Sequence, residues 1–209
     1  MLVKQLNNDG SENWHVMHSA FGATHRGYFN TTAHFAETDN GFGNINPTSS
    51  VFTVAYNGTN KSGSDYIAYC WHNVPGLQKF GTYIGNGQND NFVELGFRPA
   101  MVWVKRAIAN SSPDTSTNYS SWVVMDSSRL TYNGQTPNHL MMNKAVGEGY
   151  RGNGSLTTAL GDMLLEPHSN GFYLNNYGSE VNSDTSQYIY CAWAEAPGIN
   201  LYGAQANAR

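Results

Sequence analysis

The sequence predicts an all-β protein made of two tandem β-sandwich units of the jelly-roll or lectin-like kind. Three observations support this prediction. Apolar residues are gathered in short runs that are rich in β-branched and aromatic side chains. Glycine, asparagine, proline and serine stand between these runs, as they do at the turns of β proteins. The chain also contains an internal repeat, so one structural unit is expected to occur twice.

The expected strands follow one another along the whole chain. They comprise residues 51–56, 66–72, 92–95, 101–106, 122–126, 172–174 and 188–194. The dipeptides Asn57-Gly58, Asn133-Gly134 and Asn170-Gly171 are candidates for hairpin turns, because asparagine and glycine tolerate a positive φ. Short strands separated by regular turns are typical of a sandwich or a barrel. Helix is expected only in short stretches, at 154–165 and around 31–37.

The repeat is clearest in one strand and the turn that follows it. Five residues recur 122 positions later: Tyr66, Ile67, Trp71, Pro75 and Gly76 return as Tyr188, Ile189, Trp193, Pro197 and Gly198. Weaker similarities join 2–4 to 103–105, 14–17 to 122–125 and 50–54 to 170–174. Their offsets of 101, 108 and 120 differ, as expected where the loops between matched strands vary in length.

The repeat also predicts the domain organisation, with a first unit at 1–81, a second unit at 82–198 and a C-terminal segment at 199–209. The first unit lacks its opening strand, because nothing in it corresponds to the start of the second unit. In the C-terminal segment, Leu201-Tyr202-Gly203 keeps the 122-residue offset from Lys79-Phe80-Gly81, so a third repeat begins there. The chain is therefore expected to be either the C-terminal piece of a longer tandem array or a subunit whose missing strand comes from a neighbour. In both cases the uncovered strand edge favours self-association, and a homo-oligomer is expected.

Composition excludes several classes of function. Charged residues make up 12% of the chain, which is about half of the ~25% usual in soluble domains. The net charge of −4 leaves no basic surface for nucleic acid, and the absence of an 18-residue apolar run argues against membrane insertion. Asparagine, glycine, serine, threonine and tyrosine take the place of charges, which suits a virion or extracellular surface that contacts sugars. Cys70 and Cys191 are expected to be small buried residues without a disulfide, in keeping with folding in a reducing cytoplasm.

The second unit carries an ordered series of motifs. They are Thr-Tyr-x-Gly-Asn-Gly at 82–87, Gly-Phe-x-Pro at 96–99, Val-Trp-Val-Lys at 102–105, Trp-x-x-x-Asp-Ser-x-Arg at 122–129, Leu-x-x-Asn at 140–143, Asn-Gly-Phe-x-Leu at 170–174, and Val-Asn followed by Tyr-Ile-x-x-x-Trp at 181–193. This series resembles a domain of unknown function that is repeated in tail-fibre-like and other virion structural proteins of marine bacteriophages, including those of cyanobacteria. The first unit departs from it, because it has no Gly-Asn-Gly opening and has His18-Ser19 in place of Asp126-Ser127.

The resemblance implies a virion protein that folds in the host cytoplasm and then becomes part of a tail fibre or of the outer surface of the particle. It implies no catalytic residues. The sequence also lacks a nucleophile elbow, a phosphate loop and a metal-ligand series, so no enzyme activity, cofactor or metal is expected. A capsid-decorating protein of the same fold is one alternative. A glycan-cleaving fibre domain is another, with Asp126, Asp162 and Glu166 as its candidate carboxylates.

Aromatic residues supply the candidate binding site. Four of them lie beside glycine, asparagine or serine in expected loops: Tyr119, Tyr132, Tyr150 and Tyr177. Exposed rings there would stack on sugar faces while neighbouring amides bind hydroxyls, so host-surface glycan is a candidate partner beside other virion proteins. The alternative is that these rings pack their loops onto the sandwich. The aromatic residues within apolar strands are assigned to the core instead, namely Trp71, Trp193, Phe52 and Phe172.

Overall fold

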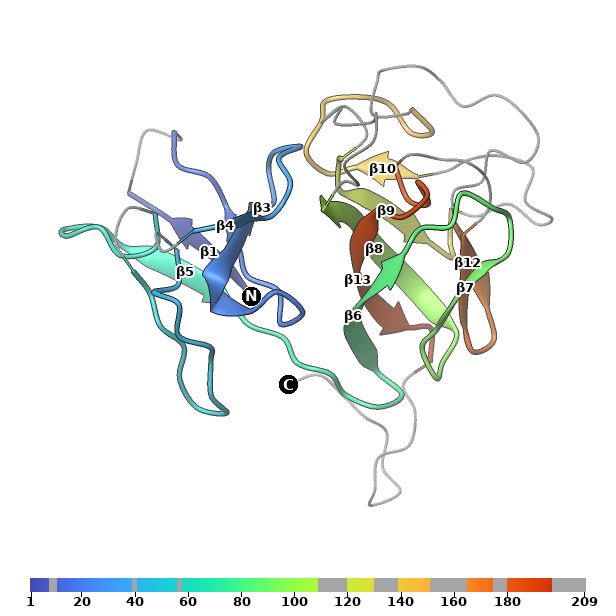
Figure 1. The fold of residues 1–209 in the computed structure, drawn as a ribbon, viewed down its shortest axis with the longest axis horizontal. Helices are drawn as coiled ribbons and strands as arrows, with labels where there is room; N and C mark the ends of the chain where they lie inside the picture. Colours follow the sequence, from blue (N-terminus) through green and yellow to red (C-terminus); the bar gives the residue numbers. More distant parts are fainter. Residues whose placement is uncertain are drawn as a thin grey trace. The chain divides into compact units, whose positions relative to one another are not determined.

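The structure is a computed structural model, and it describes residues 1–7, 11–38, 41–55, 58–108, 120–129, 139–150, 165–174 and 180–196. The chain divides into two compact units, Met1–Trp71 (the N-terminal unit) and His72–Arg209 (the C-terminal unit) (Figure 1). In the described residues all strands pair antiparallel and no α-helix occurs, so the prediction of an all-β protein is confirmed. Accordingly, no helix of the described residues has the length and hydropathy needed to cross a membrane.

The described part of the N-terminal unit contains one five-stranded sheet in the order β4-β3-β2-β1-β5. Its strands are β1 (Leu2–Gln5), β2 (His15–Val16), β3 (His25–Tyr28), β4 (Ala36–Glu37) and β5 (Tyr66–Tyr69), with a 3-10 turn at Gly22–Thr24. The helix expected around 31–37 is wrong, because Ala36 pairs with Arg26 of β3 and the segment is extended there. One face of the sheet packs on a small core of Val3, Met17, Ala23 and Phe42, with Met1 and Tyr66 against it.

The described part of the C-terminal unit contains two sheets, in the orders β10-β9-β8-β13-β6 and β11-β12-β7 (Figure 1). The strands are β6 (Gln78–Ile84), β7 (Asn91–Glu94), β8 (Pro99–Ile108), β9 (Val123–Asp126), β10 (Leu140–Met141), β11 (Leu165–His168), β12 (Gly171–Leu174) and β13 (Gln187–Ala194). Both sheets contribute to one core: Val102, Val104, Tyr188 and Tyr190 come from the first sheet, and Val93, Leu165, Phe172 and Leu174 from the second. This unit is therefore sandwich-like.

Three neighbouring strands pair in the same way in the two units. The middle strand is β1 in the N-terminal unit and β8 in the C-terminal unit. Val3 of β1 pairs with His15 of β2 and with Ala68 of β5. Val104 of β8 pairs in the same way with Val123 of β9 and with Tyr190 of β13. These residues are related by the sequence offsets of 101, 108 and 122. The triplets β2-β1-β5 and β9-β8-β13 thus have the same order, direction and register.

The division between the units lies before the expected boundary. We expected the first unit to extend to residue 81, whereas the chain divides after Trp71. The difference comes from β6, which follows β5 in the chain but pairs with β13 along its whole length (Figure 1). The strand that leaves the N-terminal unit therefore forms the outer edge of a sheet in the C-terminal unit.

Phe52 and Phe172 occupy matched positions of the repeat but differ in burial, and the sheet β11-β12-β7 of the C-terminal unit accounts for the difference. Phe172 of β12 is fully buried, as expected, because it lies in the core that both sheets share. The assignment of Phe52 to the core is wrong, since its side chain is 37% exposed. Among the described residues, the N-terminal unit has no sheet equivalent to β11-β12-β7. Cys70 was expected to be buried and is exposed, while neither it nor Cys191 forms a disulfide.

Trp71 and Trp193 also differ in the exposure of their side chains, but for another reason. Trp193 is half-buried, because Trp103 and Phe80 pack edge-on against its ring at centroid distances of 4.8 and 5.8 Å. The position equivalent to Trp103 in the N-terminal unit is Leu2, and no described strand occupies the place of β6 beside β5. Trp71 is consequently 37% exposed, so its assignment to the core is also wrong.

Candidate functional site

Three aromatic side chains, Trp14, Tyr69 and Trp71, form an exposed row on the N-terminal unit. The ring centroids of Trp14 and Tyr69 are 6.4 Å apart and those of Tyr69 and Trp71 are 6.1 Å apart. The rings are nearly parallel, with interplanar angles of 22° and 16°. Tyr69 is 42% exposed, and Trp14 is partly exposed. We call these three residues the aromatic row.

Strand periodicity places the aromatic row on the face of the sheet that is opposite to the core. Tyr69 and Trp71 are two positions apart, so their side chains point to the same side. Leu2 of β1 pairs with Tyr69 on one side and with Val16 of β2 on the other. Trp14 stands two residues before Val16 and shares its direction. The row therefore results from the register of three strands and from no single stretch of sequence.

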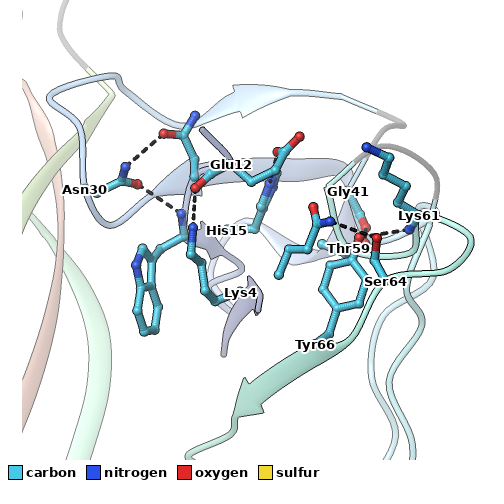
Figure 2. Close-up of polar contacts among 12 residues, drawn as sticks. Lys4, Glu12, His15, Asn30, Gly41, Thr59, Lys61, Ser64 and Tyr66 are labelled. Atoms are coloured by element: carbon cyan, nitrogen blue, oxygen red, sulfur yellow. Dashed lines mark hydrogen bonds and ion pairs between the residues drawn. The ribbon is translucent and has the colours of Figure 1, made fainter. Parts of the chain in front are cut away.

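A set of polar contacts fixes the backbone that carries Trp14. The backbone N–H of Trp14 donates to Oδ1 of Asn30 at 3.0 Å, and Nδ2 of Asn30 donates to Oδ1 of Asn13 at 2.9 Å. The Nζ of Lys4 donates to the backbone carbonyl of Glu12 (Figure 2). We call Lys4 and Asn30 the polar clamp, because together they bind three consecutive residues. The clamp restrains the tryptophan at the point where β2 begins.

The C-terminal unit has an equivalent clamp around Trp122. Asn143 accepts from the backbone N–H of Trp122 at 2.8 Å and donates to Oγ of Ser121 at 3.4 Å. Lys105 donates to the carbonyl of Ser120 at 2.6 Å, and its ammonium lies 5.7 Å from the centre of the Trp122 ring. Burial lowers the pKa of Lys105 to about 7. Trp122 is buried, so Trp14 is the clamped tryptophan that reaches solvent.

His15 lies behind the aromatic row, on the core face of β2. Its side chain is 2% exposed, and its pKa is lowered to about 4, chiefly by burial and further by the charges of Arg26 and Lys4. The carboxylate of Glu12 lies 3.9 Å from Nε2. Gly58 packs directly on the ring, since a Cβ at that position would lie 2.3 Å from Cε1. His15 is therefore neutral at pH 7 and serves as a packing residue.

Of the four tyrosines predicted to bind glycan, the structure describes Tyr150. The others lie outside the described residues: Tyr119, Tyr132 and Tyr177. Tyr150 is half-buried, and its backbone carbonyl accepts a hydrogen bond from Nε2 of His139 at 2.8 Å. A Cβ placed on Gly147 would lie 3.1 Å from the Tyr150 ring, so this ring packs against its own loop. Glycan binding by this group stays a prediction.

The carboxylates considered for glycan cleavage have local partners. Asp126 accepts from Nε of Arg129 at 2.6 Å and from the backbone N–H of Ser128 at 3.1 Å, which closes the end of β9. Glu166 of β11 lies 3.7 Å from Nε2 of His168. Asp162 lies outside the described residues. Within the described ranges no group of three histidine, cysteine, aspartate or glutamate side chains is placed to hold a metal ion.

The aromatic row is a site that sequence reasoning missed. Sequence analysis assigns Trp71 to the core, because its counterpart Trp193 stands in an apolar strand. A usable signal was nevertheless present in the alternation of side chains along β5 and the two residues that follow it, which groups Tyr69 with Trp71 on one face of the strand.

Comparisons with known proteins give a family and no function. The profile of a domain of unknown function, DUF7483, matches residues 1–197 and so runs through both structural units. No curated protein and no solved structure matches the chain. Because the matched region covers nearly all of the 209 residues, this protein belongs to the DUF7483 family.

Proposed function

We propose that this protein is a non-enzymatic structural protein of a bacteriophage virion, part of a tail fibre or another surface appendage, and that it binds host-surface glycan through the aromatic row. The observation behind the binding proposal is the exposure of nearly parallel rings on one sheet face. The virion assignment is supported by the motif series of the second unit and by the low content of charged residues.

We further infer that the chain is a tandem duplication of one jelly-roll-like sandwich unit. The inference is supported by the matched register of β2-β1-β5 and β9-β8-β13. It is also supported by the two clamps. Asn30 and Asn143 each accept a hydrogen bond from the backbone N–H of a tryptophan. Lys4 and Lys105 each donate to the carbonyl of the residue two positions before that tryptophan. The two clamps thus match in two kinds of contact, at offsets of 101 for the lysines, 108 for the tryptophan segments and 113 for the asparagines.

The aromatic row has the chemistry that sugar recognition requires. The C–H groups on one face of a pyranose ring pack on an aromatic face, while the hydroxyls at its rim bind polar groups. The hydroxyl of Tyr69 and the indole N–H groups of Trp14 and Trp71 supply such partners beside the apolar rings. With two successive centroid distances of 6.4 and 6.1 Å, the row is long enough to contact more than one sugar residue of an extended glycan.

The binding proposal is tested with Trp71→Ala and with the double variant Tyr69→Ala/Trp71→Ala. An array of bacterial surface oligosaccharides identifies a bound glycan for the native protein, and calorimetry then measures its affinity. We expect Trp71→Ala to weaken binding about tenfold, which corresponds to about 1.4 kcal/mol, and the double variant to abolish it. The matched control is Phe52→Ala, because Phe52 has the same exposure in the same unit and lies outside the row. Unchanged affinity of the double variant for an array-selected glycan would refute the assigned site.

A further inference from the structure

One edge of strand β5 has no strand partner in the described part of the chain. The other edge pairs with β1, and β5 ends the sheet order β4-β3-β2-β1-β5. The end of this strand is exposed, with Tyr69 at 42% and Cys70 also exposed. Uncovered edges with apolar residues pair readily with another strand, and proteins cover them for this reason. The edge of β5 is therefore a candidate docking surface.

The C-terminal unit shows what covers the equivalent edge. Strand β13 corresponds to β5 by the 122-residue offset, and its outer edge pairs with β6 over Gln78–Ile84 (Figure 1). Phe80 of β6 also packs edge-on against Trp193, with ring centroids 5.8 Å apart. Ile189, which is not part of the core between the two sheets, is fully buried in this strand, whereas its counterpart Ile67 in β5 is half-buried. The cover is supplied by a strand that has just left the preceding unit.

The C-terminal segment resembles part of β6 in sequence, since Tyr202 and Gly203 match Phe80 and Gly81. Leu201-Tyr202-Gly203 stands 122 residues after Lys79-Phe80-Gly81, the same offset that relates β5 to β13. In the structure Lys79 lies opposite Ala192 and Phe80 opposite Cys191. Transferring this register to β5 gives the pairs Cys70–Leu201, Tyr69–Tyr202 and Ala68–Gly203.

We propose that β5 binds residues 200–206 of a second copy of this chain as an antiparallel edge strand. The proposal rests on the duplicated architecture proposed above and names the partner and the surface of its self-association. The joint is head to tail, because a strand that follows the C-terminal unit of one copy enters the N-terminal unit of another. Such a heterologous joint builds a ring or a filament of copies. Tyr202 of the second copy then stands beside Trp71, as Phe80 stands beside Trp193, and lengthens the aromatic row.

A disulfide trap tests the pairing in the 209-residue chain. In Leu201→Cys, the new thiol lies opposite the exposed Cys70 in the transferred register. Opposed residues of antiparallel strands have Cα atoms about 4.5–5.5 Å apart, within the range that a disulfide spans. Burial raises the pKa of Cys191 to about 12, so that thiol stays protonated at pH 8 and does not compete. Mild oxidation should convert Leu201→Cys into a ladder of covalent oligomers on a non-reducing gel.

Two matched controls make the trap specific. Tyr202→Cys places its thiol on the opposite side of the added strand from Cys70 and should not crosslink. Leu201→Cys combined with Cys70→Ala should not crosslink either. A crosslinked monomer would show that the segment returns to its own chain, which would overturn the proposal. The absence of any crosslink, or equal crosslinking of Tyr202→Cys, would overturn it as well.

A second measurement does not depend on cysteine chemistry. In an antiparallel ladder alternate residues donate to the partner strand, so Leu201→Pro/Tyr202→Pro removes at least one ladder donor. We expect sedimentation velocity to show assembly of the native chain and a monomer for the double variant, with Ala208→Pro assembling normally. A native chain that stays monomeric at all concentrations would contradict the proposal. Trp71 also stands beside Tyr202 in the proposed joint, so glycan binding is measured on the Leu201→Pro/Tyr202→Pro variant with and without Trp71→Ala. Loss of either property then leaves the other result interpretable.

Discussion

Acid should destabilise this protein through His15, and replacing that residue should remove the effect. The folded-state pKa of His15 is about 4 and lies below the ordinary value of 6.5, chiefly because the side chain is buried. Arg26 and Lys4 add positive charge nearby, while the carboxylate of Glu12 at 3.9 Å acts in the opposite direction. Between these two pKa values the unfolded chain binds a proton that the folded chain rejects. The contribution of His15 to stability is therefore complete above about pH 6.5 and is lost as the pH falls towards 4.

The size of the effect follows from the two pKa values. With a folded-state pKa of about 4 and an unfolded pKa of 6.5, the linkage relation gives a loss of about 2 kcal/mol at pH 5. The loss approaches about 3 kcal/mol below pH 4, because one pKa unit corresponds to 1.36 kcal/mol. Neither ring nitrogen of His15 makes a hydrogen bond to the described residues, so a leucine at this position leaves no polar group without its partner.

The assay is urea unfolding at pH 7 and at pH 5, followed by tryptophan fluorescence. Trp14 and Trp71 report on the N-terminal unit, which contains His15. The quantity compared is the change in the free energy of unfolding between the two pH values, because Leu and His differ in absolute packing energy. We expect the native chain to lose about 2 kcal/mol more than His15→Leu. An equal loss in both proteins would refute the assigned burial of a neutral His15.

Three further predictions test the packing. Phe172→Ala removes a fully buried ring and should lower the free energy of unfolding by about 3–5 kcal/mol. Phe52→Ala changes a side chain that is 37% exposed and should lower it by less than about 1 kcal/mol, and chemical denaturation measures both changes. Asn30→Ala removes two exposed hydrogen bonds of the Trp14 segment and should cost about 0.5–1 kcal/mol, with a red-shifted tryptophan emission as a second readout. Gly171→Ala would bring a Cβ to 2.1 Å from the carbonyl oxygen of Val93, so a clear fall in melting temperature is expected, and an unchanged melting temperature would contradict the close pairing of β12 with β7.

Much of the fold could be predicted from local sequence. The segments 101–106 and 188–194 are long apolar runs between turn residues, so strand is their best conformation whatever their partners. Strand β6 was less visible, because Gln78–Ile84 mixes polar and apolar residues and its partner β13 lies more than a hundred residues away. The short strand β4 was mistaken for helix, since two residues carry no usable periodicity and only pairing with β3 fixes them.

The aromatic row could not be predicted from local sequence, because it depends on long-range register. Tyr69 and Trp71 can be grouped by alternation alone, but their contact with Trp14 requires β1 to lie between β2 and β5. Exposure is a still less local property. Trp14 and Trp122 occupy matched positions with matched hydrogen bonds, yet the second is buried and the first is partly exposed. The matched hydrogen bonds therefore do not determine exposure, which depends on the side chains that pack on each ring, such as Lys105 on Trp122.

The polar clamp of the N-terminal unit argues for a role at the surface. Around the buried Trp122, an equivalent clamp satisfies a backbone N–H that would otherwise be costly to bury. Trp14 is partly exposed and water can satisfy its backbone, so the same clamp contributes less to stability there. Its remaining effect is to fix the backbone that carries the indole, whose ring packs beside Tyr69. A ring that is already fixed loses little conformational entropy when a ligand packs on it, and such preorganisation is what a binding surface gains from a rigid aromatic group.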